Sequence, residues 1–497
     1  MYASRVAVVD CGSVYTWEEF RGRSRRLASA LRAAGLKRGD RVAFLAFNSE
    51  ALLVAHFGVP QAGGVLVAIN TRLAAAEVAN IVEHSGSHTI FFSPELAGAL
   101  AEIPPSIRKV QLGPEMELFL ATGSDSPVES VLASEDDLCA IDYTSGTTGG
   151  PKGVMYHHRG AFINAISMVV ENRLTTESCF LWTLPMFPCN GWSHTWSMAA
   201  AGSKSVCIPR IEASEIWQLL EREHVTHFNA APTVLITLAA DAAAHRLDHR
   251  VRVCTGGAPP SPTLIEQMAS LNIDLVHLYG LTETYGPLTL NVVPASIGAW
   301  GPTDQAEYKA RQGFVHVGAG SIRVVDEQMR DVPADGMILG EILARGNTLM
   351  QGYFREPEAT RAAFDGGWFH TGDVGVMHPD GSIELRDRKK DIIISGGENI
   401  STIEVEQAIA SHPAVLEVAV IAAPDDKWGE VPKAFVALKP GVTATERDII
   451  DHVRGRLAHF KAPRSVEFGS LPKTSTGKIQ KFMLRDQVWA GRKARIN

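Results

Sequence analysis

The sequence predicts an α/β protein with two parts: a large N-terminal domain of doubly wound, mostly parallel sheets with a small β-rich subdomain, and a smaller α+β C-terminal domain. Three observations support this prediction. The 497 residues are too many for one ordinary hydrophobic core. Short apolar strands alternate with amphipathic helices, as in parallel sheets that helices cover on both faces. A separate α+β pattern follows the charged segment 386–391. We expect domains at 1–388 and 389–497.

The first elements are a strand at Arg5–Val9 and a helix at Tyr15–Gly35. Thr16 and Glu19 have the spacing of a capping box at the start of this helix. Strands are expected at Val42–Ala46, Gly64–Ile69 and Thr89–Phe92, and helices at Ala51–Ala62 and Ala74–Glu83. Residues 94–137 show a weaker pattern and are expected to be irregular.

The alternation resumes after residue 155. Strands are expected at 180–184, 205–208, 226–229, 251–255 and 274–278, with a helix at 214–224. The segment 313–386 has the closely spaced glycines and β-type runs of a small β-rich subdomain. The C-terminal pattern consists of helices at Ile403–Ala410 and Glu446–Leu457 and strands at Leu416–Ile421 and Lys433–Leu438.

Composition excludes several classes of protein. The net charge of −8 gives no general attraction to nucleic acid or acidic membranes. The six cysteines include no C-x-x-C pair, which is typical of reduced thiols in a cytoplasmic protein. No apolar run reaches the roughly 18 residues of a membrane span, and no export signal is visible.

Residues 143–155 (Tyr-Thr-Ser-Gly-Thr-Thr-Gly-Gly-Pro-Lys-Gly-Val-Met) are the most informative segment. Glycine-rich backbone can approach an anion closely, hydroxyls add donors, and Lys152 supplies a charge suited to phosphate. A Walker A loop does not fit, because Pro151 precedes the lysine and Gly153 follows it. A flexible Ser/Gly linker is the other alternative, and the order of these residues argues against it.

This segment resembles the phosphate-binding signature of the adenylate-forming superfamily, and the resemblance favours the acyl-CoA synthetases of the medium-chain and aromatic-acid branch. Six motifs occur in the family's order, and together they cover nearly the whole chain. They are Tyr143–Met155, Gly256–Pro259, Tyr279–Pro287, Thr371–Asp373, Asp387–Asn399 and Lys473–Lys481. The resemblance implies ATP, Mg²⁺ and coenzyme A as partners. It also implies a reaction in which a carboxylate attacks the α-phosphorus of ATP, and a thiol then attacks the acyl-adenylate.

The resemblance also implies roles for individual residues. Lys478 would serve adenylation, Glu283 would bind Mg²⁺, and Lys390 would be the hinge about which a mobile C-terminal domain rotates. The implied ATP- and AMP-binding residues are Thr144, Ser145, Gly146, Thr147, Thr148, Lys152, Gly256, Gly257, Ala258, Tyr279, Gly280, Thr282, Asp373 and Arg388. Within this set, Tyr279 would stack on adenine and Asp373 would accept the ribose hydroxyls.

The acyl and coenzyme A side is expected to involve Pro188, Trp192, His194, Phe228, Leu281, Gly396 and Gly397. Ala230, Thr255, Gly280 and Leu288 are further pocket candidates, and the set suggests a bulky apolar acid. Pro188 departs from the family pattern, which has histidine there. Proline has no side-chain donor, so we expect weak adenylation of free acids unless His194 substitutes.

The sequence therefore predicts an ATP-dependent acyl-CoA ligase in the cytoplasm, with a small carboxylic acid as substrate. Three alternatives stay open: an enzyme that performs mainly one half-reaction, a luciferase-like oxygenase, and a non-catalytic adenylate- or CoA-ester-binding protein. A homodimer is also an open alternative.

Overall fold

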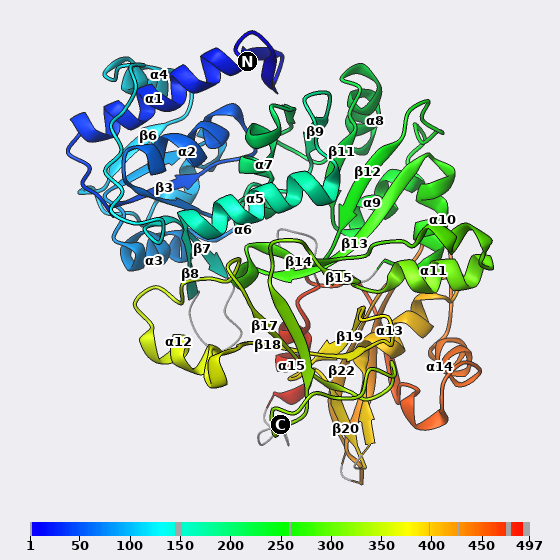
Figure 1. The fold of residues 1–497 in the computed structure, drawn as a ribbon. Coiled ribbons are helices and arrows are strands. Elements are labelled where there is room, and N and C mark those ends of the chain that lie inside the picture. The colour runs from blue at the N-terminus through cyan, green and yellow to red at the C-terminus, as the bar shows by residue number, and fades with distance from the viewer. Residues whose placement is uncertain are drawn as a thin grey trace.

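Four sheets form the framework of the described residues, which are 2–144, 152–257, 260–396, 398–425, 427–473 and 479–490 of the computed structural model. Two large sheets belong to the N-terminal part, and two smaller sheets follow residue 320 (Figure 1). The architecture is mixed α/β, with a large N-terminal domain built on mostly parallel sheets and a smaller C-terminal domain, as the sequence predicts.

The first large sheet has six strands in the order β6-β5-β3-β4-β7-β8. Its strands are parallel except for the antiparallel pair β7–β8. Their bounds are β3 Arg41–Leu45, β4 Val65–Ala68, β5 Thr89–Phe92, β6 Arg108–Gln111, β7 Leu138–Thr144 and β8 Lys152–His157. The neighbouring helices are α1 Trp17–Ala33, α2 Glu50–Gln61, α3 Ala75–Ser85 and α4 Pro114–Ala121.

The second large sheet has nine strands in the order β15-β14-β13-β12-β11-β9-β10-β1-β2. The strands from β13 to β1 in this order are parallel, and antiparallel strands close both edges. The bounds are β1 Val6–Asp10, β2 Ser13–Thr16, β9 Cys179–Trp182, β10 Lys204–Cys207, β11 His227–Ala230, β12 Val251–Thr255, β13 Ile273–Leu281, β14 Gly286–Leu290 and β15 Phe314–Val315.

The helices of this region are α5 His158–Asn172, α6 Cys189–Trp192, α7 His194–Ala201, α8 Ala213–Arg222, α9 Pro232–Ala240, α10 Pro262–Ser270 and α11 Pro302–Ala310. Figure 1 shows α5 running across the front between the blue and green parts. One continuous hydrophobic core joins residues of both large sheets, so the two sheets form one packed unit.

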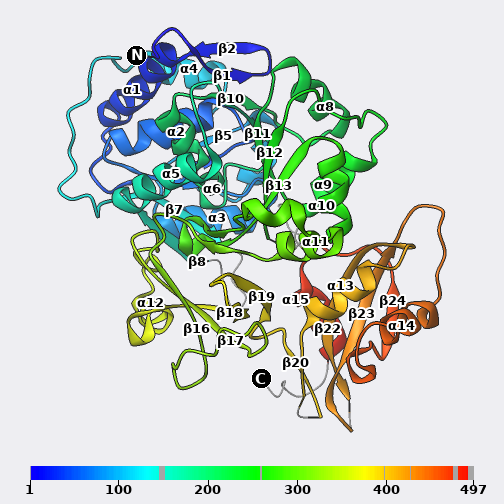
Figure 2. The same ribbon diagram turned by 45° about the vertical axis from the view of Figure 1, so that its right-hand side comes forward.

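The smaller sheets lie below the large ones in both views (Figures 1 and 2). The four-stranded sheet consists of β16 Ser321–Val325, β17 Gly340–Arg345, β18 Phe369–Met377 and β19 Ile383–Arg388, and the short helix α12 Pro357–Ala363 accompanies it. The five-stranded sheet consists of β20 Ile393–Ser395, β21 Glu398–Ile400, β22 Val415–Asp425, β23 Gly429–Leu438 and β24 Ser465–Phe468. Its helices are α13 Thr402–Ala410, α14 Glu446–Arg454 and α15 Lys481–Trp489.

The capping box predicted for the first helix is present. Thr16 Oγ1 accepts a hydrogen bond from the Glu19 amide at 3.2 Å, and Glu19 Oε2 accepts one from the Thr16 amide at 2.7 Å. The prediction that 94–137 is irregular is wrong, because a 3₁₀ helix (Pro94–Leu100), β6 and α4 lie there. Among the described residues, no helix combines the length and the apolar character needed to cross a bilayer.

Candidate active site

The expected phosphate-binding loop joins β7 to β8. These strands pair antiparallel, and Thr144 lies opposite Lys152 where they end. Ser145, Gly146, Thr147 and Thr148 lie outside the described residues. The structure therefore places Thr144 at the end of β7 and Lys152 at the start of β8, at the base of the loop.

Tyr353 lies beside Lys152 and was not found by sequence reasoning. The segment around it runs along β8, where the Met155 amide donates to the Gly352 carbonyl at 3.0 Å. This pairing brings the Lys152 ammonium to 4.8 Å from the centroid of the Tyr353 ring. The contact joins segments about two hundred residues apart, so only the tertiary structure identifies it.

The Tyr353 hydroxyl also donates to Oε1 of Glu283 at 2.9 Å. Glu283 lies in the 3₁₀ turn Thr282–Thr284 that follows β13, and the Tyr156 hydroxyl donates to the Thr282 carbonyl at 2.5 Å. Burial raises the pKa of Glu283, and the hydrogen bond from Tyr353 opposes that effect. Lys152, Glu283 and Thr282 therefore come together around two tyrosines.

Glu283 has the properties of a ligand for a magnesium–nucleotide complex. Mg²⁺ is usually bound in proteins by one or two carboxylates and completes its coordination with water and phosphate oxygens. The described residues contain no cluster of three or more histidine, cysteine or acidic side chains that could enclose a metal. One carboxylate near Lys152, the residue expected to bind phosphate, fits Mg²⁺ that is held largely by ATP.

Asp373 links three strands of two sheets. It lies on β18 directly opposite Arg388 of β19, and the Arg388 Nε lies 3.3 Å from Oδ1. The Tyr279 hydroxyl, from β13, donates to Oδ2 at 2.8 Å. The Asp373 side chain is 3% exposed, and that of Arg388 is 35% exposed. Since each carboxylate oxygen has two lone pairs, Asp373 retains acceptor capacity for the ribose hydroxyls expected there.

The expected glycines lie where backbone comes very close to other groups. A Cβ at Gly256 would lie 2.7 Å from Cδ1 of Leu278, and one at Gly280 would collide with the Gly286 carbonyl. Gly257 has a φ of 84°, in the left-handed region that favours glycine. These residues follow β12 or end β13, at the carboxyl edge where ligands of doubly wound sheets bind. Ala258 lies outside the described residues.

The expected acyl-binding residues divide into two groups. Pro188 and Trp192 are partly exposed at the two ends of α6, and Leu281 is partly buried at the end of β13. Phe228 and Leu288 are 0% exposed and belong to hydrophobic core clusters. Side chains enclosed in this way stabilise the core, so the first group carries the acyl-site prediction.

His194 is also enclosed. It is 1% exposed, its ring stacks on Phe180 with centroids 4.9 Å apart, and Nδ1 lies 3.0 Å from the Trp192 carbonyl and 3.2 Å from Nδ2 of Asn229. Burial lowers its pKa to about 4. The imidazole is therefore neutral near pH 7 and already engaged by its neighbours.

Gly396 lies between two strands of the five-stranded sheet. Gly396 turns the β20–β21 hairpin with a φ of 61°, and its amide donates to the Trp428 carbonyl at 2.8 Å. In Figures 1 and 2 the β20 end of its sheet points away from the two large sheets. Gly397 and Lys478 lie outside the described residues.

Lys390 lies between β19 and β20, in the connection from the large part to the small one. Burial, followed by the charges of Arg388 and Arg485, lowers its pKa to about 8. The next residue, Asp391, forms an ion pair with Arg485 of α15. The connecting segment is thereby tied to the C-terminal helix.

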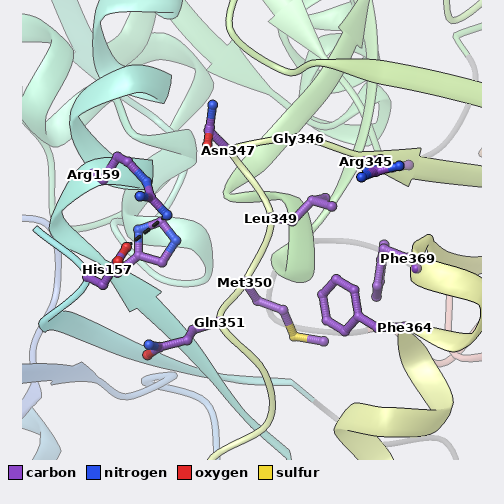
Figure 3. Close-up of a pocket in the computed structure, with 13 residues that line it drawn as sticks. His157, Arg159, Arg345, Gly346, Asn347, Leu349, Met350, Gln351, Phe364 and Phe369 are labelled. Atoms are coloured by element: carbon purple, nitrogen blue, oxygen red, sulfur yellow. Dashed lines mark ion pairs between the residues drawn. The ribbon is translucent and has the colours of Figure 1, made fainter.

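A cavity of about 370 Å³ lies at the far end of β8 from Lys152 (Figure 3). His157, Arg159 and Asn347 line one side of it, and Phe364 and Phe369 line the other. The cavity borders the group around Glu283, because Met350 lines it and the Met350 amide donates to the Glu283 carbonyl at 2.8 Å.

Comparison with known proteins gives full-length matches. A family model for AMP-binding enzymes matches residues 1–354, and one for the C-terminal domain of AMP-binding enzymes matches residues 404–478. Among solved structures, ATP-bound MatB from Rhodopseudomonas palustris is 28% identical with a TM-score of 0.89, over 99% of this chain and 97% of that chain.

Three curated relatives are similar over 98% of this chain. A peroxisomal acetate/butyrate–CoA ligase of Arabidopsis thaliana is 42% identical over 92% of its own length. A 4-hydroxybutyrate–CoA ligase of Metallosphaera sedula is 39% identical, also over 92% of its length. A peroxisomal trans-cinnamate:CoA ligase of Petunia hybrida is 39% identical over 92% of its length.

Proposed function

Since this chain belongs to the AMP-binding enzyme family and is an AMP-forming acid–CoA ligase, we propose that its acid substrate is a short aliphatic carboxylate on the scale of acetate or butyrate. The relatives named for acetate, butyrate and 4-hydroxybutyrate support this choice. Mg²⁺ and coenzyme A are part of the proposal.

The position of Trp192 is the observation that carries the proposal. A Cβ at Gly286 would lie 3.0 Å from Cα and 3.1 Å from Cδ1 of Trp192, so the indole lies directly against the start of β14. Trp192 also packs against a cluster at the strand ends that includes Leu278 and Leu290. Gly286 follows the turn that carries Thr282 and Glu283, and we propose that the ring of Trp192 bounds the space for an acyl chain there.

In the first step, a carboxylate oxygen of the acid forms a bond to the α-phosphorus while the bond from that phosphorus to the bridging oxygen breaks, and pyrophosphate leaves. Lys152 would hold the terminal phosphates, and Thr282 would donate to the α-phosphate. Asp373 would fix the ribose, and Lys478 would bridge the carboxylate and the α-phosphate. Mg²⁺ bound at Glu283 would supply neutralising charge to the phosphates.

In the second step, the sulfur of coenzyme A attacks the acyl carbonyl, the carbon–sulfur bond forms, and the bond to the AMP oxygen breaks. The thiol proton leaves and AMP departs with both bonding electrons. Gly396 and Gly397 would border the pantetheine path after rotation about Lys390. This rotation is part of the proposal, as is the domain boundary between 388 and 389.

A bulky apolar acid is the competing prediction, and the relative named for trans-cinnamate favours it. The half-reaction alternative depends on Pro188 and is tested separately. The oxygenase and the non-catalytic alternatives receive no support from relatives named as ligases. A homodimer and a cytoplasmic location stay predictions, and the Arabidopsis relative is named a peroxisomal enzyme.

The test is an acid panel with ATP, Mg²⁺ and coenzyme A, in which acyl-CoA and AMP are quantified together. Acetate or butyrate should exceed benzoate and trans-cinnamate in kcat/KM by about tenfold or more, the discrimination expected of a hydrophobic pocket that fits one acid better. A preference for the aromatic acids would overturn the short-acid proposal in favour of the bulky acid.

A matched pair of variants tests the role of Trp192. Trp192→Ala should raise the hexanoate-to-butyrate ratio of kcat/KM by about tenfold, because the acyl chain gains space. Trp300→Ala removes the same side chain at a site that is 37% exposed and should leave the ratio unchanged. An unchanged ratio in both variants would show that Trp192 does not limit chain length.

A further inference from the structure

Five consecutive residues beside the proposed acid site form a left-handed turn. Their φ angles are 58° at Cys189, 48° at Asn190, 62° at Gly191, 57° at Trp192 and 61° at Ser193. Residues other than glycine rarely adopt this conformation, and usually only one at a time. Such strained backbone persists where the surroundings enforce it, and it is concentrated at functional sites.

Buried hydrogen bonds hold the turn at both ends. Asn190 Nδ2 donates to Oδ2 of Asp142 on β7 at 2.7 Å. At the other end, Asn164 Nδ2 donates to the Ser193 hydroxyl at 2.9 Å, and that hydroxyl lies 3.3 Å from the Tyr285 carbonyl. Asp142 is 1% exposed and Asn190 is 0% exposed. These contacts tie the turn to β7, α5 and the segment before β14.

The Asp142 carboxyl also accepts hydrogen bonds from the backbone of Asn190 and Cys189. Burial raises its pKa to about 7, and the hydrogen bonds from Asn190 and Cys189 oppose that rise. Among the described residues, Asp142 Oδ1 and Asn190 Oδ1 are both buried without a hydrogen-bond partner. A carboxyl group costs free energy in such a place, and a purely apolar pair would avoid that cost. The polar pair therefore serves the conformation of the turn.

The turn contacts the reaction site on two sides. The Cys189 thiol donates to the Thr282 hydroxyl across 3.5 Å. Burial raises the pKa of Cys189 to about 12, so the sulfur keeps its proton. Trp192 lies against Gly286 at the other end of the same segment. The turn thus fixes both the residue expected at the α-phosphate and the ring expected to limit the acid.

We propose that Asp142 and Asn190 are positioning residues, whose hydrogen bond holds the left-handed turn so that Cys189 orients Thr282 and Trp192 bounds the acid. This inference rests on the proposed acid–CoA ligase function. It adds a determinant of acid placement that touches neither ATP nor the acid. The Thr195 hydroxyl also donates to the Asn190 carbonyl at 3.1 Å, within the turn.

The test separates the hydrogen bond from the backbone conformation. Asn190→Gly keeps the left-handed conformation accessible and removes the bond to Asp142, whereas Asn190→Ala removes both. We expect Asn190→Gly to raise KM for the acid by about tenfold, the size of one lost buried bond to a charged group. KM for ATP should stay within about twofold, because the Tyr156 hydroxyl still holds the Thr282 backbone and Lys152 and Asp373 would still hold the nucleotide. Asn190→Ala should raise KM for the acid further, because it also disfavours the left-handed backbone.

Asp142 provides a second set of variants. Asp142→Ala should raise KM for the acid at least as much as Asn190→Gly, because it also removes the acceptor of the backbone bonds from Asn190 and Cys189. The double variant should be no worse than Asp142→Ala alone, because Asp142→Ala already removes the side-chain bond. Asp142→Asn, which keeps the shape and an acceptor oxygen, should restore most of the acid affinity. If these variants fail to fold, Thr195→Val is a milder change that should raise KM for the acid several-fold.

Ser203→Ala is the control, since its buried hydroxyl donates to the Thr175 carbonyl at 2.7 Å, away from the site. It should leave both KM values unchanged. Equal rises in the KM for acid and for ATP, or a lower melting temperature with unchanged KM for the acid, would overturn the positioning role. Wild-type protein that makes no acyl-CoA from any acid would instead contradict the proposed function.

Discussion

The Tyr279 hydroxyl donates a 2.8 Å hydrogen bond to Oδ2 of Asp373, although 94 residues separate the two in the chain. Both side chains are enclosed, with Tyr279 5% and Asp373 2% exposed. The bond joins the large parallel sheet to the four-stranded sheet. Sequence reasoning assigned both residues to the nucleotide, one to adenine and one to ribose, without linking them.

Tyr279→Phe should weaken ATP binding and leave the acid largely unaffected. The variant removes one hydrogen bond to a carboxylate, worth roughly 1.5 to 3 kcal/mol. Among the described residues, Arg388 then remains as the ion-pair partner of Asp373. We expect KM for ATP to rise by about tenfold or more, measured by pyrophosphate release. Tyr308→Phe, which loses a 3.4 Å bond to the Val292 carbonyl, should leave KM for ATP unchanged. Equal effects in both variants would mean that Tyr279 does not act through Asp373.

Lys478→Ala should separate the two half-reactions. The lysine is assigned to the developing charge between carboxylate and α-phosphate, and one lost contact of this kind costs about two or more powers of ten in rate. Pyrophosphate release should fall by that amount, while conversion of supplied acyl-adenylate to acyl-CoA should remain. Lys439→Ala is the control, because that exposed ammonium donates to the Pro413 carbonyl at 2.8 Å, within the C-terminal domain. Equal loss in both half-reactions would refute the assignment.

Lys390→Pro should impair thioester formation more than adenylation. Hinges absorb backbone changes, and proline fixes φ and removes the amide donor. Lys390→Ala is the matched variant, because it removes the ammonium, whose pKa is lowered to about 8, and keeps the backbone free. We expect only the proline variant to slow the coenzyme A step, measured from supplied acyl-adenylate. Both half-reactions slowing together in Lys390→Pro would contradict the hinge.

Pro188→His tests whether the missing imidazole weakens adenylation. Pro188 immediately precedes α6, next to the thiol that contacts Thr282, and His194 is enclosed against Phe180. Positioning of a nucleophile can contribute several kcal/mol, so the wild type should adenylate free acids slowly compared with its use of supplied acyl-adenylate. The histidine variant should exchange ATP and pyrophosphate faster. Robust exchange in the wild type, unimproved by histidine, would show that Pro188 is a tolerated variation.

Local patterns predicted much of the fold. Thr16 and Glu19 cap the first helix as expected, and the apolar strands at 42–46, 89–92 and 251–255 lie within parallel sheets. The strand β6, Arg-Lys-Val-Gln, was missed because an edge strand that is half exposed lacks a continuous apolar run. The helix at 114–121 was missed although Pro114, Glu115 and Glu117 are residues typical of a helix start.

The candidate site was predictable only as a set of motifs. Thr144, Lys152, Glu283 and Asp373 were found from the sequence, and the structure places them on strands or turns of adjoining sheets. Tyr353 could not be predicted as a site residue, because it reaches Lys152 only through the pairing of its own segment with β8. Asn190 and Asp142 were missed for the same reason, since the left-handed turn that joins them has no local signal apart from Asn-Gly.

The transfer of oxygen from the acid to AMP tests the central claim most directly. The protein is given butyrate labelled with ¹⁸O in both carboxylate oxygens, with ATP, Mg²⁺ and coenzyme A, and the products are analysed by mass spectrometry. Attack of the carboxylate on the α-phosphorus predicts that each AMP carries one labelled oxygen, that pyrophosphate carries none, and that AMP and butyryl-CoA form in equal amounts. Label in pyrophosphate or phosphate, or unlabelled AMP formed alongside butyryl-CoA, would contradict an acyl-adenylate formed in this site.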